Sequence, residues 1–257
     1  MRLRTALRSH IGRVRQVNED RAWIGTVSGG LTAAAVADGM GGHNAGDVAS
    51  TIAIDSLSQS LSLWDAALSA EASEGKLREL VLKANTAVFE AAESHAQYHN
   101  MGTTVIIALI DEKDGLIGHI GDSRVYRVRG GAIEQLTEDH TLVNELAKSG
   151  QLSPEEAANH PRRNVLMRAL GTDRDVAVDV LRIEMLPGDR LLLCSDGLSN
   201  LVERETILDT LTATDIDLDE AADRLIALAL AAGGYDNVTV ALIDYASAGA
   251  AAEGGTP

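Results

Sequence analysis

The sequence predicts an α+β fold in which antiparallel sheets lie inside and helices cover them from outside. Segments typical of strands follow one another through short turns, as in residues 103–137, and such short connections favour antiparallel pairing. Segments typical of helices come in pairs between these runs of strands instead of alternating singly with them. At 257 residues, 45% of them hydrophobic, the chain can form one large domain, and no repeat of fixed period is visible.

The N-terminal part of the chain predicts a meander of three strands. A short strand is followed by a turn at residues 12–20 and by a second strand at residues 22–27. Ser28, Gly29 and Gly30 then return the chain into a strand of small apolar residues at 31–37. We therefore expect hairpin turns between all three strands.

Two helices and a second group of strands are expected next. Residues 46–64 favour a helix, and residues 76–97 favour one more clearly, because apolar side chains repeat along one face. These are Leu77, Leu80, Val81, Ala84, Val88 and Ala91. Four short strands follow within residues 103–137.

A pair of short helices then interrupts the strands. The first, at residues 138–149, ends at Gly150. The second opens with Ser153, Pro154 and Glu156, which supply an N-cap, a first-turn proline and the glutamate of a capping box. We call the whole insertion, residues 139–171, the flap.

The C-terminal part completes the pattern of strands and paired helices. Strands are expected at 176–185 and 189–194, helices at 203–211 and 218–232, and a last strand at 237–245. Residues 1–245 are thus expected to form a single domain. The remainder, residues 246–257, is a low-complexity stretch rich in alanine and glycine that we expect to be disordered.

Composition limits the function and the cellular location. A formal net charge of −16 argues against nucleic acid as a partner, because binding a phosphate backbone requires clustered lysine and arginine. No apolar run is long enough for a membrane helix, and the basic start is not followed by a signal-peptide core. A single cysteine, Cys194, agrees with a reducing compartment. We expect a soluble cytoplasmic protein.

Aspartates recur at the ends of apolar strands, and this pattern predicts a metal site. Asp38, Asp122, Asp196 and Asp236 each adjoin such a run, where an unpaired charge is costly. A single Asp-Gly is typical of a hairpin turn, but four similar sites indicate that a divalent cation compensates the charge. The glycines after Asp38, beginning with Gly39, carry no Cβ and would let a backbone carbonyl approach the ion.

Carboxylates from distant segments, with few nitrogen ligands, favour hard cations. Two divalent ions about 3.5 to 4 Å apart, bridged by a carboxylate and a water, stabilise in-line attack on phosphorus and activate that water. Such a site also requires one positive group for the phosphate. Oxygen ligands favour magnesium or manganese over zinc.

Seven motifs, in this order, resemble those of the bacterial metal-dependent (type 2C, PPM) serine/threonine protein phosphatases. They are RVRQVNED at 13–20, VADGMGGH at 36–43, MGTT at 101–104, GDSR at 121–124, LTEDH at 136–140, SDG at 195–197 and DNVTV at 236–240. The resemblance spans roughly residues 9–243. It implies a four-layer α-β-β-α sandwich of two antiparallel sheets flanked by helices, with a dinuclear Mg²⁺ or Mn²⁺ centre at one end.

The resemblance also implies metal ligands. Asp38 would bridge the two ions, and Asp196 and Asp236 would complete the first. The Gly39 carbonyl and the Glu19 side chain would complete the ligands of the second ion. Asp20 would orient waters bound to the metals.

Two further roles follow from the same resemblance. Arg15 matches the phosphate-binding arginine of the family, and its planar fork suits a phosphate monoester. His43 is a candidate general acid, although it lies further beyond Asp38 than in relatives, and packing of the loop remains the alternative. His119 and His140 are expected to be structural.

A third metal site is expected to be weak or empty. Asp122 matches a carboxylate that holds this ion together with Asp196. Where the family usually has a further aspartate, this chain has Asn200, whose amide oxygen can ligate a metal but carries no charge.

The predicted function is hydrolysis of phosphoserine and phosphothreonine in proteins by a water that bridges two ions. The resemblance implies phosphorylated proteins as substrates, a partner serine/threonine kinase by analogy, and a role in signal transduction; we expect a monomer. The flap is expected to be mobile and to set substrate preference.

A non-catalytic, metal-stabilised binding module of the same fold is the alternative. A cysteine phosphatase is disfavoured because Asn200, not arginine, is the sixth residue after Cys194, and a two-metal nuclease because the chain is acidic.

Overall fold

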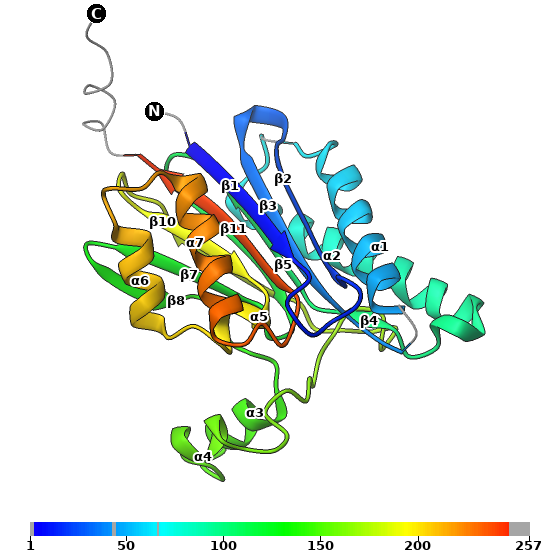
Figure 1. The fold of residues 1–257 in the computed structure, drawn as a ribbon. Coiled ribbons are helices and arrows are strands. Elements are labelled where there is room, and N and C mark those ends of the chain that lie inside the picture. The colour runs from blue at the N-terminus through cyan, green and yellow to red at the C-terminus, as the bar shows by residue number, and fades with distance from the viewer. Residues whose placement is uncertain (1–2, 43–44, 66, 247–257) are drawn as a thin grey trace, which may run out of the picture.

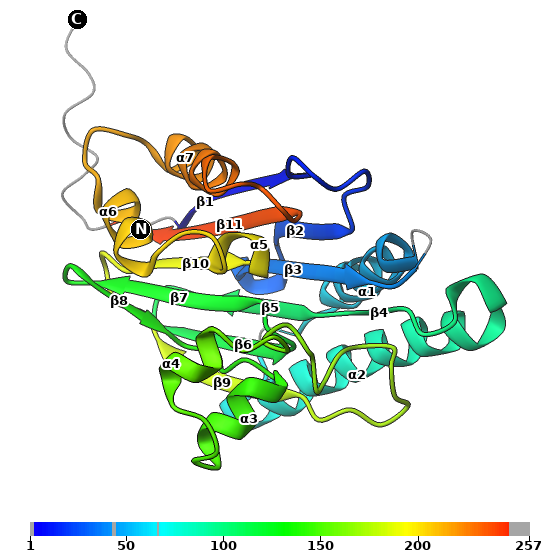
Figure 2. The same cartoon turned by 60° about the horizontal axis from the view of Figure 1, so that its bottom comes forward.

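Two antiparallel sheets pack face to face between two layers of helices (Figures 1 and 2). The structure, a computed structural model, describes residues 3–42, 45–65 and 67–246. The predicted α+β sandwich of four layers is confirmed by this arrangement. Within the described ranges, every helix is too short or too polar to cross a membrane.

The first sheet has the strand order β1-β11-β10-β7-β8, with all neighbours antiparallel. Its strands are β1 (Leu3–His10), β11 (Val238–Tyr245), β10 (Arg190–Cys194), β7 (Arg124–Arg129) and β8 (Ala132–Gln135). Helices α6 (Arg204–Thr212) and α7 (Leu218–Ala231) cover its outer face. Leucine and valine side chains of β10 and β11 form a buried cluster with the apolar faces of these helices.

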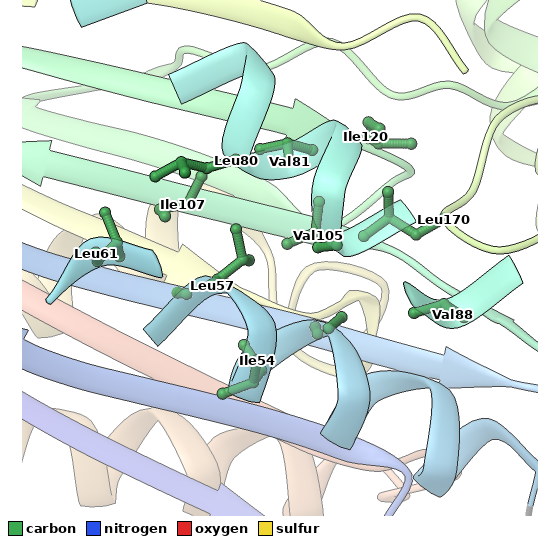
Figure 3. Close-up of a cluster of buried hydrophobic side chains, with 14 of the residues drawn as sticks. Ile54, Leu57, Leu61, Leu80, Val81, Val88, Val105, Ile107, Ile120 and Leu170 are labelled. Carbon is green, nitrogen blue, oxygen red and sulfur yellow. The ribbon is translucent and has the colours of Figure 1, made fainter. Parts of the chain in front are cut away.

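The second sheet has the strand order β2-β3-β5-β6-β9, again antiparallel. Its strands are β2 (Asp20–Thr26), β3 (Thr32–Met40), β5 (Val105–Ile110), β6 (Asp114–Ile120) and β9 (Asp179–Glu184), and the short β4 (Gly102–Thr103) pairs with the end of β3. Helices α1 (Ala45–Leu61) and α2 (Ala70–Ser94) cover its outer face. Figure 3 shows Leu57 of α1 and Val81 of α2 gathered over Ile107 of β5.

A third core lies between the sheets, and β3 contributes to two cores at once. Ala33 and Ala35 belong to the cluster under the helices, whereas Ala34 and Val36 belong to the cluster between the sheets. This alternation follows from the period of two in a strand. A strand buried on both faces reads as the continuous apolar run seen in the sequence.

The flap projects beyond the sheets at one end of the sandwich (Figures 1 and 2). It contains the short helices α3 (Leu142–Lys148) and α4 (Pro154–Ala158). The predicted capping box is present, since Ser153 and Glu156 bond each other's backbone N–H groups at the start of α4. At its base, Thr141 bridges to Leu166, which closes the insertion.

Several local predictions are wrong. Strands β1 and β2 do not form a hairpin, because β1 pairs with β11 and β2 with β3 in the other sheet. Helix α2 starts at Ala70, capped by Ser69, rather than at residue 76. The first flap helix starts at Leu142 rather than at residue 138. A short helix, α5 (Asp196–Ser199), was not predicted.

Candidate active site

Seven of the predicted site residues meet in one pocket of about 240 Å³ at the end of the sandwich from which the flap projects. The pocket is lined by Arg15, Glu19, Asp38, Gly39, Met40, Gly41, Thr104, Asp122, Asn164, Leu166, Asp196 and Asp236. These residues come from both sheets, from the connection between β1 and β2, and from the flap. Residues up to 221 positions apart in sequence are thus in contact here.

Asp38 lies inside β3, not after its end as the Asp-Gly turn suggested. The strand continues to Met40, where it pairs with β4. The backbone N–H of Asp38 donates to Thr104 Oγ1 over 3.0 Å, and its carbonyl accepts from the N–H of Thr104 over 2.9 Å. These bonds fix the direction from which the Asp38 side chain enters the pocket.

Gly39 is required by close packing and not by a sharp turn. A Cβ at this position would lie 2.0 Å from the carbonyl oxygen of Gly46 and 2.8 Å from that of Glu19. Its backbone N–H donates to the Glu19 carbonyl over 3.2 Å. The absence of a side chain therefore lets the start of α1 and the segment before β2 lie directly against β3.

Asp196 and Asp236 reach the pocket from the neighbouring strands of the first sheet. Asp196 is the first residue of α5, directly after β10 and Ser195. Asp236 precedes β11 and is followed by Asn237, whose Oδ1 accepts from the Glu19 N–H over 2.8 Å. Asn237 Nδ2 donates to the carbonyls of Ile11 and Val17, so one amide side chain holds the loop between β1 and β2 against β11.

Asp20 lies behind the pocket and does not line it. Its side chain is 1% exposed, and Oδ2 accepts from Ser195 Oγ over 2.7 Å. Oδ1 is buried without a hydrogen-bond partner among the described residues. Burial is the largest cause that raises the pKa of Asp20 to about 7, and Asp196 and Asp236 add to it.

The carboxylates of the pocket destabilise one another's charged forms. Burial, followed by the charges of Asp20, Asp196 and Asp122, raises the pKa of Asp38 well above its usual value. Burial and Asp196 raise the pKa of Asp122 to about 7. Burial and Asp236 raise the pKa of Asp196 to about 6, while a hydrogen bond with Asp38 opposes the rise. The protein thus holds several acids where only added positive charge would keep them ionised.

This donor set fits hard divalent cations. Carboxylate oxygens converge on one pocket, Asp20 Oδ1 is an unused buried acceptor, and none of the described residues that line the pocket is a histidine. In the described part of the chain, no three acidic, histidine or cysteine side chains already form a closed ligand set. Magnesium and manganese sites require no such set, because these ions keep several waters and use only a few carboxylates each.

Glu19 and Arg15 line the same pocket as these acids. Burial is the main cause that raises the pKa of Glu19, while Arg15 and the backbone of Gly46 at the start of α1 lower it. Burial lowers the pKa of Arg15, but the charges of Asp236, Glu19 and Asp38 and the hydrogen bond to Asp236 raise it overall. One Arg15 nitrogen donates to Asp236 Oδ2 over 2.8 Å, and about half of the Arg15 side chain remains exposed.

The remaining predicted residues have different locations. Asn200 lies outside the pocket and donates through Nδ2 to Asp196 Oδ2 over 3.0 Å. His43 lies outside the described residues. His119 and His140 are buried away from the pocket lining, with ring centroids 4.7 Å apart, and burial lowers the pKa of His119 to about 3.

A wider groove of about 640 Å³ continues from the pocket between the flap and the first sheet. It shares Asp122, Asn164 and Asp196 with the pocket, and it is also lined by flap residues such as Asn144 and Arg163. Sequence reasoning missed the parts played by Thr104, Asn237 and Asn164. The first two belong to the MGTT and DNVTV motifs, whereas no motif marked Asn164.

Comparison with known proteins agrees with this geometry. The family described as "Protein phosphatase 2C" matches residues 8–242. The serine/threonine phosphatase stp of Listeria monocytogenes is 42% identical over 237 residues, which are 92% of this chain and 94% of that protein. The serine/threonine protein phosphatase PstP of Mycobacterium tuberculosis is 43% identical over 247 residues, 94% of this chain but 45% of that longer protein.

Solved structures of similar sequence share the fold. The crystal structure of M. tuberculosis PstP/Ppp has a TM-score of 0.86 at 41% identity and covers 95% of this chain and 99% of that one. The S. agalactiae serine/threonine phosphatase has a TM-score of 0.89 at 35% identity, with the same two coverages. The catalytic domain of PstP in complex with two manganese ions has a TM-score of 0.83 at 39% identity, again covering 95% and 99%.

Proposed function

Because this chain belongs to the protein phosphatase 2C family, we propose that it is a metal-dependent phosphatase that hydrolyses phosphoserine and phosphothreonine in proteins. One observation carries the proposal: Asp38, Asp122, Asp196 and Asp236 meet with Arg15 in a single pocket. Binding a phosphate on divalent ions requires several acidic side chains for the ions and one cationic side chain for the phosphate.

The residues that would hold two Mn²⁺ or Mg²⁺ ions line this pocket. Asp38 would contact both ions, with Asp196 and Asp236 on the first, and Glu19 and the Gly39 carbonyl on the second. When bound, the ions supply an activated water and offset negative charge at phosphorus. This assignment is supported by the raised pKa values of the acids and by the manganese-bound PstP catalytic domain.

The side chains around the ions would orient the reactants. Arg15 would transfer from Asp236 to the phosphate, where its planar fork can donate two hydrogen bonds. Asp20, with one buried and unpartnered oxygen, would orient waters on the ions from behind the pocket. Release of phosphate by direct attack of water requires no covalent bond to the protein.

The substrates would be phosphorylated proteins, with a serine/threonine kinase as the opposing partner in the cytoplasm and the phosphatase acting as a monomer. The groove beside the flap supports a peptide substrate, because it is continuous with the pocket and larger than the pocket. Since the flap forms one wall of the groove, changes in the flap would alter substrate preference.

The test is turnover of a phosphothreonine peptide with and without Mn²⁺. Hydrolysis should require the metal and should be lost in Asp38→Ala and Asp196→Ala, while Asp215→Ala, on the exposed surface, serves as the matched control. Absence of turnover with either metal in the folded wild type would overturn the proposal and favour a binding module.

A further inference from the structure

Two large apolar side chains lie exposed at the edge of the pocket, each next in sequence to a residue that lines it. Val14 is 61% exposed and precedes Arg15, and Tyr235 is 64% exposed and precedes Asp236. Of the chain's single phenylalanine, two tryptophans and four tyrosines, all of which are described, only Tyr235 is exposed, whereas the other six are buried or half-buried. An exposed aromatic residue beside a reaction site indicates contact with a ligand more strongly than one elsewhere.

Backbone contacts join the two loops that carry these side chains. The N–H of Arg13 donates to the Gly234 carbonyl over 2.7 Å, and the side chains of Arg15 and Asp236 form their ion pair one residue beyond Val14 and Tyr235. The loops that carry Val14 and Tyr235 are therefore held against each other beside the pocket.

The Tyr235 ring has a defined position in spite of its exposure. A Cβ on Gly233 would lie 2.5 Å from both Cε2 and Cζ of the ring, so the ring lies directly on the Gly233 backbone. Gly233 has a φ of +124°, a conformation that other residues rarely adopt. The ring is thus supported on one side and open to solvent on the other, which makes it a surface on which another group can pack.

We propose that Val14 and Tyr235 form an apolar shelf that binds one apolar side chain of the substrate, within two residues of the phosphorylated serine or threonine. The inference rests on the proposed phosphatase function. An extended peptide advances about 3.3 Å per residue, so the neighbours of a residue whose phosphate contacts Arg15 pass over the residues next to Arg15 and Asp236. The shelf would therefore select an apolar residue next to the phosphorylated one.

The first experiment measures this preference with five phosphothreonine peptides. One has serine at all flanking positions, and the others carry a single leucine at position −2, −1, +1 or +2. We expect at least one leucine peptide to have a kcat/KM about 5- to 10-fold above the all-serine peptide, as partial burial of a leucine side chain would give. Equal turnover of all five overturns the shelf but leaves the phosphatase function intact, whereas no turnover of any peptide overturns the phosphatase function.

The second experiment assigns the preference to these residues by using the ratio of the two kcat/KM values within each variant. The double variant Val14→Ser, Tyr235→Ser should reduce the ratio to less than about 2, and Tyr235→Phe should keep it because the ring remains. Leu63→Ser and Leu186→Ser, which change exposed leucines that line neither the pocket nor the groove, are the matched controls and should also keep it. A ratio that survives in the double variant would show that leucine binds elsewhere.

Discussion

Arg15 is proposed to bind the phosphate of the substrate, but its side chain is paired with a carboxylate in this structure. In this structure it donates to Asp236, one of the proposed metal ligands, and half of its side chain is open to solvent. An ion pair of a partly exposed arginine contributes little free energy, so the arginine can exchange a carboxylate for a phosphate at low cost. Binding of metal by Asp236 would weaken its hold on Arg15 and so release the guanidinium for the substrate.

Replacing Arg15 should impair substrate binding more than metal binding. We expect Arg15→Ala to lower kcat/KM for a phosphopeptide about 10- to 100-fold, with Arg15→Lys in between because it keeps the charge but loses the fork. Steady-state kinetics and a Mn²⁺ titration measure the two effects separately. Arg13→Ala, an exposed arginine in the same loop, is the control. Equal kinetics for Arg15→Ala and Arg13→Ala would rule out the phosphate contact.

Asp38 should make the metal-free protein less stable, although it is the residue proposed to contact both metal ions. Folding without metal must either bury its charge among other carboxylates or take up a proton. We expect Asp38→Asn to raise the Tm in EDTA by about 3 to 6 °C and to remove most of the further rise that Mn²⁺ gives the wild type. Thermal melts with EDTA and with Mn²⁺ test this, with Asp215→Asn as the control. A lower Tm in EDTA would contradict the expectation.

Asn200 should limit the number of ions bound. Its amide donates a hydrogen bond to Asp196 and so occupies one oxygen of that acid. It adds no negative charge beside Asp122. We expect Asn200→Asp to bind one Mn²⁺ more than the wild type at millimolar metal, because a third carboxylate then joins Asp122 and Asp196. Counting bound Mn²⁺ by equilibrium dialysis checks this, and Asn159→Asp is the control. Identical binding curves for wild type and Asn200→Asp would show that the substitution does not restore a third site.

At the scale of elements, a histidine ties the flap to both the pocket loop and the second sheet. His140 Nδ1 accepts from the N–H of Gly121, next to Asp122, and Nε2 lies 3.1 Å from Asp179 of β9. Arg168, in the C-terminal part of the flap, donates to Asp179 over 3.1 Å. The base of the flap and the loop carrying Asp122 are therefore held by one hydrogen-bond network.

Removing this tie should cost stability. His140→Ala leaves the buried Gly121 N–H without an acceptor and creates a cavity, so we expect the free energy of unfolding to fall by about 2 to 4 kcal/mol. His140→Asn should recover part of the loss, since its amide oxygen can accept a hydrogen bond. Urea denaturation measures the change, and His99→Ala, which is exposed on the surface, should lie within about 0.5 kcal/mol of wild type. A His140→Ala variant as stable as His99→Ala would contradict this role.

At the scale of the molecule, the pocket depends on how closely the two sheets approach each other. Asp38 comes from the second sheet and Asp196 and Asp236 from the ends of strands in the first, so the distance between the sheets sets the spacing of the acids. Small side chains make this approach possible, since Ala34 of β3 faces the core between the sheets with no exposed area.

Enlarging that position should therefore separate the sheets. We expect Ala34→Leu to lower the free energy of unfolding by about 1 to 3 kcal/mol, because a filled core has no room for the added carbons. Chemical denaturation tests this, and Ala132→Leu on the exposed edge of β8 is the matched control, expected within about 0.5 kcal/mol of wild type. Equal stability of the two variants would show that the space between the sheets is not tightly filled.

The sequence by itself determined the family, the class of fold and most of the pocket residues. Local signals such as the apolar run before Asp38 and the capping box at Ser153 were sufficient to predict the strand β3 and the start of helix α4, because these signals depend on neighbouring residues alone. The family match confirms the membership and the class of enzyme that the seven motifs predicted. The roles of all the pocket residues as ligands for phosphate and metal stay predictions.

Only the tertiary structure decided which strands pair, why Gly39 is glycine and which residues stand at the edge of the pocket. β1 and β2 adjoin in sequence yet belong to different sheets, since each strand takes the partner whose apolar face completes a shared core. Tyr235 carried no signal in the sequence, because its exposure depends on Gly233 and on a loop more than two hundred residues away. Strand pairing and side-chain exposure depend on contacts between segments that are distant in sequence, and the local sequence pattern contains no information about those contacts.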